Sequence, residues 1–379
     1  MIIRVLAGLA CTAALAAPAF AIDETVETEE GAVRLTTVAE GLEHPWGLAF
    51  LPEGGMLVTE RPGRLRYVAA DGTVSGPIAG VPQVDNRRQG GLLDVALDPD
   101  FASSRLVYLS YAEPGDGGTT STAVARGTLS EDLTGLGGLE VIFSQRPKVQ
   151  STMHYGSRLV FDGNGHLFIT TGERSHDQFR VQAQDLNSHL GKVIRIYPDG
   201  SVPEDNPFVG QEGALPEIWS YGHRNIQGAA LHPETGALWI NEHGPRGGDE
   251  LNRIQEGGNY GWPLVTEGTE YSGAPINPPA DLPPGLVEPI AYWVPSPAPS
   301  GLTFYDAAMF PGWQGDAFMG ALAGTSLIRI DMDGDRAVGD EFLFTDFGMR
   351  IRDVVQGPDG ALYLLTDEGN GQVLRVSAP

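Results

Sequence analysis

A strand pattern that occurs six times constrains the fold of this chain more than any other feature. Each copy has an apolar strand, a turn rich in Pro, Gly and Asp, and a second strand that ends in polar residues. The first strands of the copies begin at Trp46, Leu93, Arg158, Gly228, Gly301 and Asp353. These short runs are rich in β-branched and aromatic side chains, which is typical of antiparallel hairpins and not of helices.

The spacing of the copies predicts the architecture. Equivalent positions in successive copies are 47, 64, 70, 73 and 52 residues apart. Each repeat therefore has room for about four strands, the size of one propeller blade. We predict an all-β fold, a six-bladed β-propeller of four-stranded antiparallel blades, as a single domain over residues 22–379. Two stacked antiparallel sheets are the alternative, which the even repeat disfavours.

A propeller also needs its ring to be closed. The alternating stretch Val33–Val38 is predicted to form the outer strand of the last blade, and Val373–Val376 to complete that blade. The two ends of the domain would then share one sheet.

The first 21 residues have the pattern of a secretory signal peptide. Arg4 precedes an apolar stretch, Val5–Ala17, that is too short to span a bilayer, and Ala19–Ala21 fits a cleavage site. The only cysteine, Cys11, lies in this segment, so the mature chain would have no disulfide and no thiolate ligand. We expect a periplasmic or secreted protein without membrane insertion.

The formal net charge of −25 limits the partners of the protein. A field of this sign repels phosphate backbones and favours cations, so nucleic acid is not expected as a partner. A surface that is acidic for solubility alone is the alternative explanation of the charge.

Polar residues recur in register before the first strand of each copy. They are His44, Gln89, His154, Arg224 with Asn225, Ser296, and Arg350 with Arg352. The innermost strands of a propeller run along its central channel, so these residues are predicted to meet at one mouth of that channel. Each has a structural alternative, such as a turn His or an Arg paired with an acidic residue. Together, the arginines favour an anionic ligand with several carboxylates.

A second polar cluster lies in the fourth copy. Asn241–Asn252 and Gly257–Pro263 are rich in oxygen donors and in the Gly and Pro residues that orient backbone carbonyls. Calcium binds six to eight such oxygens and is the fitting metal, whereas zinc would lack thiolates and have only His223 and His243. A long surface turn is the alternative.

These motifs resemble one family, the soluble glucose and aldose sugar dehydrogenases that depend on pyrroloquinoline quinone (PQQ). The resemblance extends from about residue 35 to residue 376. It is carried by His44–Leu48, Gln89–Asp94, His154 with Arg158–Phe161, Gly222–Asn225, Glu242–Pro245, Gly257–Pro263 and Arg350–Asp353. It implies a six-bladed propeller, in agreement with the repeat, and oxidation of aldose sugars at C1 to lactones with transfer of electrons to an external acceptor.

The resemblance also implies roles for individual residues. His154 would be the general base, Glu173 the acid that orients it, and Arg224 the group that stabilises charge on the quinone. The residues implied to contact PQQ are Gln89, Arg224, Asn225, Ser296, Arg350 and Arg352. The carbonyls of Gly244 and Pro245 would bind the calcium ion beside PQQ, and Glu250 and Tyr260 a second, structural calcium. The oligomeric state, monomer or homodimer, stays open.

One clear departure from the family pattern, with a milder one beside it, leaves alternatives open. Ala323 stands where the family places a Lys against PQQ, and Ser296 replaces a Thr. A propeller that binds carbohydrate or protein without turnover, having lost PQQ, is therefore an alternative. A calcium-dependent lactone hydrolase on the same fold is another.

Overall fold

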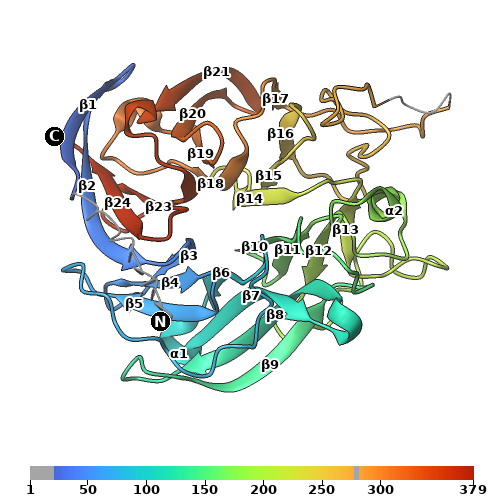
Figure 1. Cartoon of the computed structure of the whole chain (residues 1–379), viewed down its shortest axis with the longest axis horizontal. Coiled ribbons are helices and arrows are strands. Elements are labelled where there is room, and N and C mark those ends of the chain that lie inside the picture. Colours follow the sequence, from blue (N-terminus) through green and yellow to red (C-terminus); the bar gives the residue numbers. More distant parts are fainter. Residues whose placement is uncertain (1–20, 277–280) are drawn as a thin grey trace, which may run out of the picture.

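The computed structural model describes residues 21–276 and 281–379, and the predicted signal peptide lies outside them apart from Ala21. Six antiparallel sheets surround a central axis like the blades of a propeller (Figure 1). The first strands of neighbouring blades contact one another around the whole ring, from β3 through β6, β10, β14, β18 and β22 back to β3. The predicted six-bladed propeller is confirmed.

The strands follow one another outward from the axis in each blade. The first three blades contain β3 (Pro45–Phe50), β4 (Met56–Glu60) and β5 (Arg64–Val68); β6 (Leu92–Leu97), β7 (Leu106–Pro114), β8 (Thr120–Leu129) and β9 (Leu136–Ser144); and β10 (Gly156–Phe161), β11 (Leu167–Thr171), β12 (Lys192–Ile196) and β13 (Ile218–Tyr221). The fourth and fifth contain β14 (Ile226–Leu231), β15 (Leu238–Glu242), β16 (Asp249–Arg253) and β17 (Ala291–Trp293); and β18 (Pro299–Phe304), β19 (Ala317–Ala321), β20 (Ser326–Asp333) and β21 (Arg336–Leu343).

The last blade joins the two ends of the domain. It contains β22 (Ile351–Gln356), β23 (Leu362–Thr366), β24 (Gly371–Ser377), β2 (Gly31–Leu42) and β1 (Asp23–Thr28). β2 pairs antiparallel with β24, with Leu35 opposite Val376, so the predicted closure is confirmed. β1 adds a fifth strand, visible at the outer edge beside β2 (Figure 1).

Four of the six blades have four regular strands, as predicted. The first blade has three, and its outer edge is completed only by isolated bridges from Leu65 to Ile78 and from Val68 to Val74. Short helical turns lie in the connections: α1 (Phe101–Ser104), η1 (Asp116–Gly118), α2 (Asp177–Arg180), η2 (Val181–Gln184), η3 (Pro311–Trp313) and η4 (Thr345–Phe347). Within the described residues no helix is long and apolar enough to cross a membrane.

Apolar side chains pack between the faces of adjacent blades. Between the fifth and last blades, Trp313 and Phe318 pack with Leu35 and Leu364. Between the second and third, Tyr108 packs with Leu159 and Ile169. Because every blade buries both faces in this way, the channel end of each inner strand is held at a fixed distance from the axis.

The inner strand of every blade is irregular at the same point. The pairing of the first and second strands shifts register near the start of β3, β6, β10, β14, β18 and β22. Such bulges change the direction of side chains beside functional sites. The polar residues that were predicted to form a ring stand at or just before these six bulges.

Candidate active site

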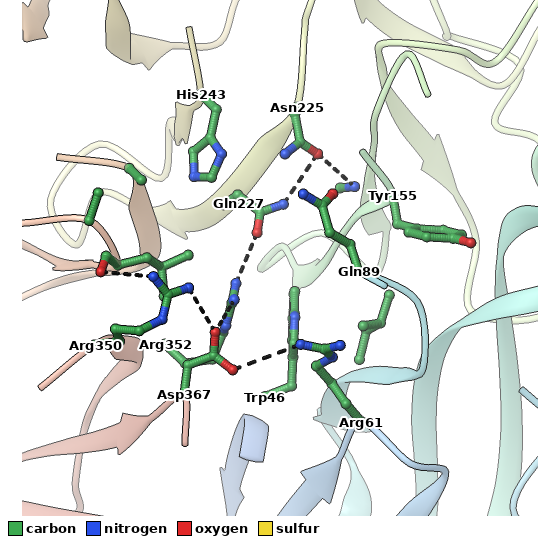
Figure 2. A pocket seen from close by; sticks show the side chains of 15 residues that line it. Trp46, Arg61, Gln89, Tyr155, Asn225, Gln227, His243, Arg350, Arg352 and Asp367 are labelled. Carbon is green, nitrogen blue, oxygen red and sulfur yellow. Dashed lines mark hydrogen bonds and ion pairs between the residues drawn. The ribbon is translucent and has the colours of Figure 1, made fainter. Parts of the chain in front are cut away.

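A cavity of about 220 Å³ lies near the propeller axis, beside the bulged ends of the inner strands. It is lined by Trp46, Arg61, Gln89, Leu93, Tyr155, Gly156, Asn225, Gln227, His243, Ala298, Leu322, Ala323, Arg350, Arg352 and Asp367. Figure 2 shows that guanidinium groups and amides from different blades converge on it. The cavity thus combines positive charge with amide donors and acceptors.

Asp367 organises the arginines of the cavity. Its carboxylate accepts hydrogen bonds from Arg350 Nη2 at 3.1 Å and Arg352 Nη2 at 2.9 Å, and Arg61 Nη1 lies 3.9 Å away (Figure 2). His44, the ring residue of the first blade, contacts the same carboxylate at 3.2 Å. Three guanidiniums face one carboxylate, so the cavity keeps an excess of positive charge that suits an anion.

Three amide side chains form the opposite side of the cavity. Asn225 Oδ1 accepts from Gly156 N and from Gln227 Nε2, both at 3.3 Å. Gln227 Oε1 in turn accepts from Arg352 Nη1 at 3.1 Å (Figure 2). Gln89 is exposed at the mouth, and its Oε1 accepts the backbone N–H of His154 at 2.7 Å.

His154 and Glu173 form a buried pair beside this cavity. Their Nδ1 and Oε1 atoms are 3.2 Å apart, and both residues are at most 5% exposed. Burial lowers the pKa of His154 despite the opposing effect of Glu173. For Glu173, burial raises the pKa, but His154 and Arg224 outweigh it and the net pKa is lowered. An ionised Glu173 keeps the proton on Nδ1, which leaves the Nε2 lone pair of His154 free to accept a proton.

Arg224 links this pair to the fourth blade. Its Nε lies 4.0 Å from Glu173 Oε1, and its Nη1 donates to the carbonyls of His243 at 3.1 Å and Gly244 at 2.6 Å. The backbone N–H of Arg224 donates to Glu242 Oε2 at 2.6 Å. The Nε atom is buried and has no hydrogen-bond acceptor among the described residues; the Glu173 carboxylate lies 4.0 Å from it.

The carbonyls that were predicted to bind calcium lie in a tightly packed turn. A Cβ on Gly244 would stand 2.2 Å from the Gly247 carbonyl, and Gly244 N donates to Asp249 Oδ1 at 2.8 Å. Pro245 lines a neighbouring cavity of about 540 Å³ together with Ser296, whose hydroxyl donates to Asp249. Ala323 lines both cavities.

Glu250 and Tyr260 line a third cavity of about 10 Å³, large enough for one small ion or water. Burial, with the nearby Glu242, raises the pKa of Glu250 to about 8. The Tyr260 hydroxyl donates to the Arg253 carbonyl at 2.7 Å, so its backbone carbonyl is the atom available to a metal. No group of three or more His, Cys, Asp or Glu side chains in the described ranges is arranged to hold a metal ion.

The structure brings most of the sequence-predicted residues to one region but not to one surface. Gln89, Asn225, Arg350 and Arg352 line the central cavity. His154 is joined to it through Gln89. Arg224, Gly244, Glu250 and Tyr260 line the small cavity, and Pro245 and Ser296 the larger one.

Sequence reasoning missed several lining residues that share one register position. Arg61, His243, Leu322 and Asp367 each directly follow the second strand of a blade and line the cavity. Three of those strands end in a polar residue, namely Glu60, Glu242 and Thr366, and the position after such an end is the sequence signal that could have found Arg61, His243 and Asp367.

A six-bladed propeller with a polar cavity near its axis is the architecture of one class of propeller enzyme. Comparisons with known proteins identify the family. Residues 42–375 match the family model described as glucose/sorbosone dehydrogenase. The chain is 48% identical over 362 residues to the aldose sugar dehydrogenase YliI of Escherichia coli, covering 95% of this chain and 97% of that protein. The chain therefore belongs to the glucose/sorbosone dehydrogenase family of oxidoreductases.

Solved structures agree with this assignment. The apo form of the soluble aldose sugar dehydrogenase from Escherichia coli superimposes on this structure with a TM-score of 0.88 at 50% sequence identity. The match covers 92% of this chain and 100% of that chain. The PQQ-bound aldose sugar dehydrogenase from Streptomyces coelicolor gives a TM-score of 0.75 at 30% identity, covering 96% and 100%.

Proposed function

We propose that this protein oxidises aldose sugars at C1 to lactones, with PQQ as its cofactor, and passes the electrons to an external acceptor. The observation that carries the proposal is the cavity in which Arg61, Arg350 and Arg352 converge beside the His154–Glu173 pair. Family membership and the PQQ-bound relative support the same assignment. A periplasmic or secreted location is proposed from the N-terminal sequence alone.

The residues of the cavity fit the quinone cofactor. PQQ carries three carboxylates, and three guanidiniums with one counter-charge are suited to bind them. The amides of Gln89 and Asn225 offer donors and acceptors to the polar edge of a planar ligand. When bound, PQQ supplies the acceptor for the hydride from the sugar.

In this proposal His154 accepts the proton of the C1 hydroxyl at Nε2. Glu173 keeps the imidazole in the required tautomer and stabilises the imidazolium that forms, because its carboxylate faces Nδ1. The Arg224 guanidinium, whose Nε lies 4.0 Å from Glu173 Oε1, would stabilise negative charge that develops near this pair.

The donor set of the fourth blade fits calcium. The Gly244 carbonyl oxygen already accepts a hydrogen bond from a cationic group, the Arg224 guanidinium. Calcium favours such carbonyl oxygens, and those of Gly244 and Pro245 would bind it together. Glu250 and the Tyr260 carbonyl would hold the second ion, where the mutual repulsion of Glu250 and Glu242 would be relieved by a divalent cation.

The proposal is tested by titrating the mature protein with PQQ and Ca²⁺ and then following dye reduction with glucose. Sugar-dependent reduction should saturate with PQQ, and His154→Ala should lower kcat by about 10²–10⁴-fold while leaving PQQ binding within a few-fold of the wild type. Failure of the wild type to bind PQQ would refute the assignment. Equal activity of the variant would remove His154 as the base.

Ala323 favours one second candidate, a propeller that binds without turnover. Its methyl group lines the cavity where the resembling enzymes present a Lys, so one cationic contact to the cofactor is missing. If this loss limits PQQ binding, Ala323→Lys should tighten PQQ binding by about 10-fold, the value of one charged hydrogen bond. Equal PQQ affinities in wild type and variant would show that the remaining arginines suffice.

A lactone hydrolase is less well supported by the channel residues. That activity would need carboxylates that hold a calcium ion in the channel. Asp94 and Asp353 lie there, but both face Arg158, at 3.1 and 3.0 Å, so an arginine takes the place of the cation.

A further inference from the structure

Arg174 carries a buried positive charge that the proposed reaction does not use. Its side chain is completely buried, and within the described part of the chain no carboxylate oxygen lies within 4.0 Å of it. Burial lowers the pKa of its guanidinium. A buried charge without a paired carboxylate is costly, so it persists only where several hydrogen bonds compensate.

The hydrogen bonds of Arg174 converge on the segment that leads into His154. Nη1 donates to the His154 carbonyl at 3.1 Å, and Nη2 donates to the Ser151 carbonyl at 2.7 Å. The Ser151 hydroxyl donates back to the Arg174 carbonyl at 2.6 Å. One planar guanidinium thus holds both ends of the turn from Ser151 to His154.

Arg174 also fixes Tyr155, the next residue and part of the cavity wall. The guanidinium carbon lies 3.6 Å from the centre of the Tyr155 ring, a stacked cation–π contact. Nη2 donates to Thr120 Oγ1 at 2.7 Å, and the Thr120 hydroxyl donates to the Ser151 carbonyl at 2.5 Å. The Tyr155 hydroxyl, 2.9 Å from Thr120 Oγ1, is therefore the donor in that pair.

The backbone of His154 needs this support. Its φ is 52°, in the left-handed region that residues with a Cβ rarely occupy. A Cβ on Gly172 would lie 2.1 Å from the His154 carbonyl, so that oxygen is packed against the chain next to Glu173. His154 is then held at three points: its N–H by Gln89, its ring by Glu173 and its carbonyl by Arg174.

We propose that Arg174 is a positioning residue for the base: by holding the carbonyl of His154 it fixes the strained backbone and so the placement of the imidazole against Glu173. This inference rests on the proposed role of His154 in sugar oxidation. Glu173 and Arg174 are adjacent in sequence, so one short segment grips the ring and the main chain of the same histidine.

The test compares Arg174→Met with a matched control, Arg195→Met. Arg195 is another buried arginine of the third blade, stacked on Trp219 at 4.6 Å, and it makes no contact with His154. We expect Arg174→Met to lower kcat by about 10–100-fold, the loss that follows when a base moves by a fraction of an ångström to 1 Å. KM for glucose should stay within about 3-fold of the wild type, as a positioning role predicts. The control should keep kcat.

A second readout does not depend on turnover. The ring nitrogens of His154 are followed by NMR as a function of pH in the apo protein. The charged or titratable groups whose fields act on this ring are Glu173, Arg174, Arg224 and His243. Removing the Arg174 charge should move the His154 titration to higher pH and broaden its signals in Arg174→Met, and neither change should occur in Arg195→Met.

A His154 titration in folded Arg174→Met that superimposes on the wild type would overturn the proposal, as would a kcat loss matched by the control. If Arg174→Met does not fold, Arg174→Lys decides, because one ammonium group cannot replace the fork between His154 and Ser151. Arg174→Lys keeps the charge, so its His154 titration should stay near that of the wild type, but a smaller loss of kcat and a smaller broadening of the His154 signals are expected, and the absence of both would overturn the proposal. If the wild type does not oxidise sugar, the proposed function fails, while the NMR titration still decides the role of Arg174.

Discussion

At the scale of single residues, Glu173 controls the basicity of His154. Burial lowers the pKa of His154, and the Glu173 carboxylate opposes that effect. A general base acts when neutral, so kcat/KM should rise with pH through this pKa. Glu173→Gln removes the opposing charge, so the pKa of His154 should fall and the acidic limb of the kcat/KM profile should move to lower pH. The plateau of kcat/KM should fall about 10-fold, since the imidazolium that forms is less stabilised. A pH profile with dye reduction checks both changes, and a limb that moves to higher pH would contradict the assignment.

Asp367 is expected to matter for stability as well as for the cavity. Burial raises the pKa of its carboxyl, but Arg352 and Arg350 outweigh burial and hold that pKa well below its usual range. A carboxyl with a lowered folded pKa stabilises the protein above its unfolded pKa of about 4, and this contribution disappears as the pH falls further. Asp367→Asn should therefore lower the free energy of unfolding by about 3 kcal/mol at pH 7.

The difference should shrink below about pH 4, where the unfolded wild-type chain takes up a proton at Asp367 while the folded protein still holds this carboxyl ionised. Urea unfolding of both proteins at pH 7 and at lower pH measures it. Asp205→Asn is the control, because Asp205 pairs with Arg195 but is 72% exposed, and no measurable change is expected. A gap that stays constant with pH would show that the pair does not titrate as described.

At the scale of secondary-structure elements, β2 and β1 illustrate how the ring is closed. Leu35 on β2 is fully buried among side chains of the fifth and last blades, whereas Val26 on β1 is only partly buried at the edge. Leu35→Ala should lower the free energy of unfolding by about 3 kcal/mol through the cavity it creates. Val26→Ala should cost about 1 kcal/mol or less. Denaturant midpoints compare the two, and equal losses would show that β1 contributes to closure as much as β2.

The elements also show which parts of the fold were accessible from sequence. The paired strands of each blade follow from local alternation and turns, so all six hairpins were predicted. β1 was not, because its sequence, Asp23–Thr28, has little apolar character and its strand exists only by pairing with β2. The irregular edge of the first blade, where Val74 and Ile78 form single bridges, likewise follows from tertiary context and not from pattern.

The residues of the candidate site likewise divide into those that the sequence predicts and those that it does not. Gln89, Asn225, Arg350 and Arg352 could be predicted because a repeating register brings equivalent positions to one mouth of the channel. Arg174 could not, because its role depends on where a left-handed turn places one carbonyl, and periodicity carries no such information.

At the scale of the whole molecule, one arginine joins five of the six blades at the axis. Arg158 of the third blade contacts Asp94 of the second at 3.1 Å and Asp353 of the last at 3.0 Å, and its guanidinium lies 4.1 Å from the centre of the Trp46 ring in the first. Its Nε donates to the Gln227 carbonyl of the fourth blade at 2.7 Å. Trp46 and Gln227 line the cavity, so this ion triad supports its wall.

Removing Arg158 should destabilise the propeller in a pH-dependent way. Burial raises the pKa of Asp353 to about 6 even with Arg158 present, and burial raises the pKa of Asp94 as well. A carboxyl with a raised folded pKa is best tolerated below its unfolded pKa of about 4 and costs more stability as the pH rises toward the folded value. Arg158→Met leaves two buried carboxyls without their cation, so their folded pKa values should rise further. The loss should be about 3–5 kcal/mol at pH 7 and smaller at pH 5, as measured by urea unfolding. Arg158→Lys keeps the charge and should recover part of that loss at pH 7. If the loss in Arg158→Met is instead independent of pH, Arg158 stabilises the axis by packing against Trp46 and not by neutralising the two carboxylates.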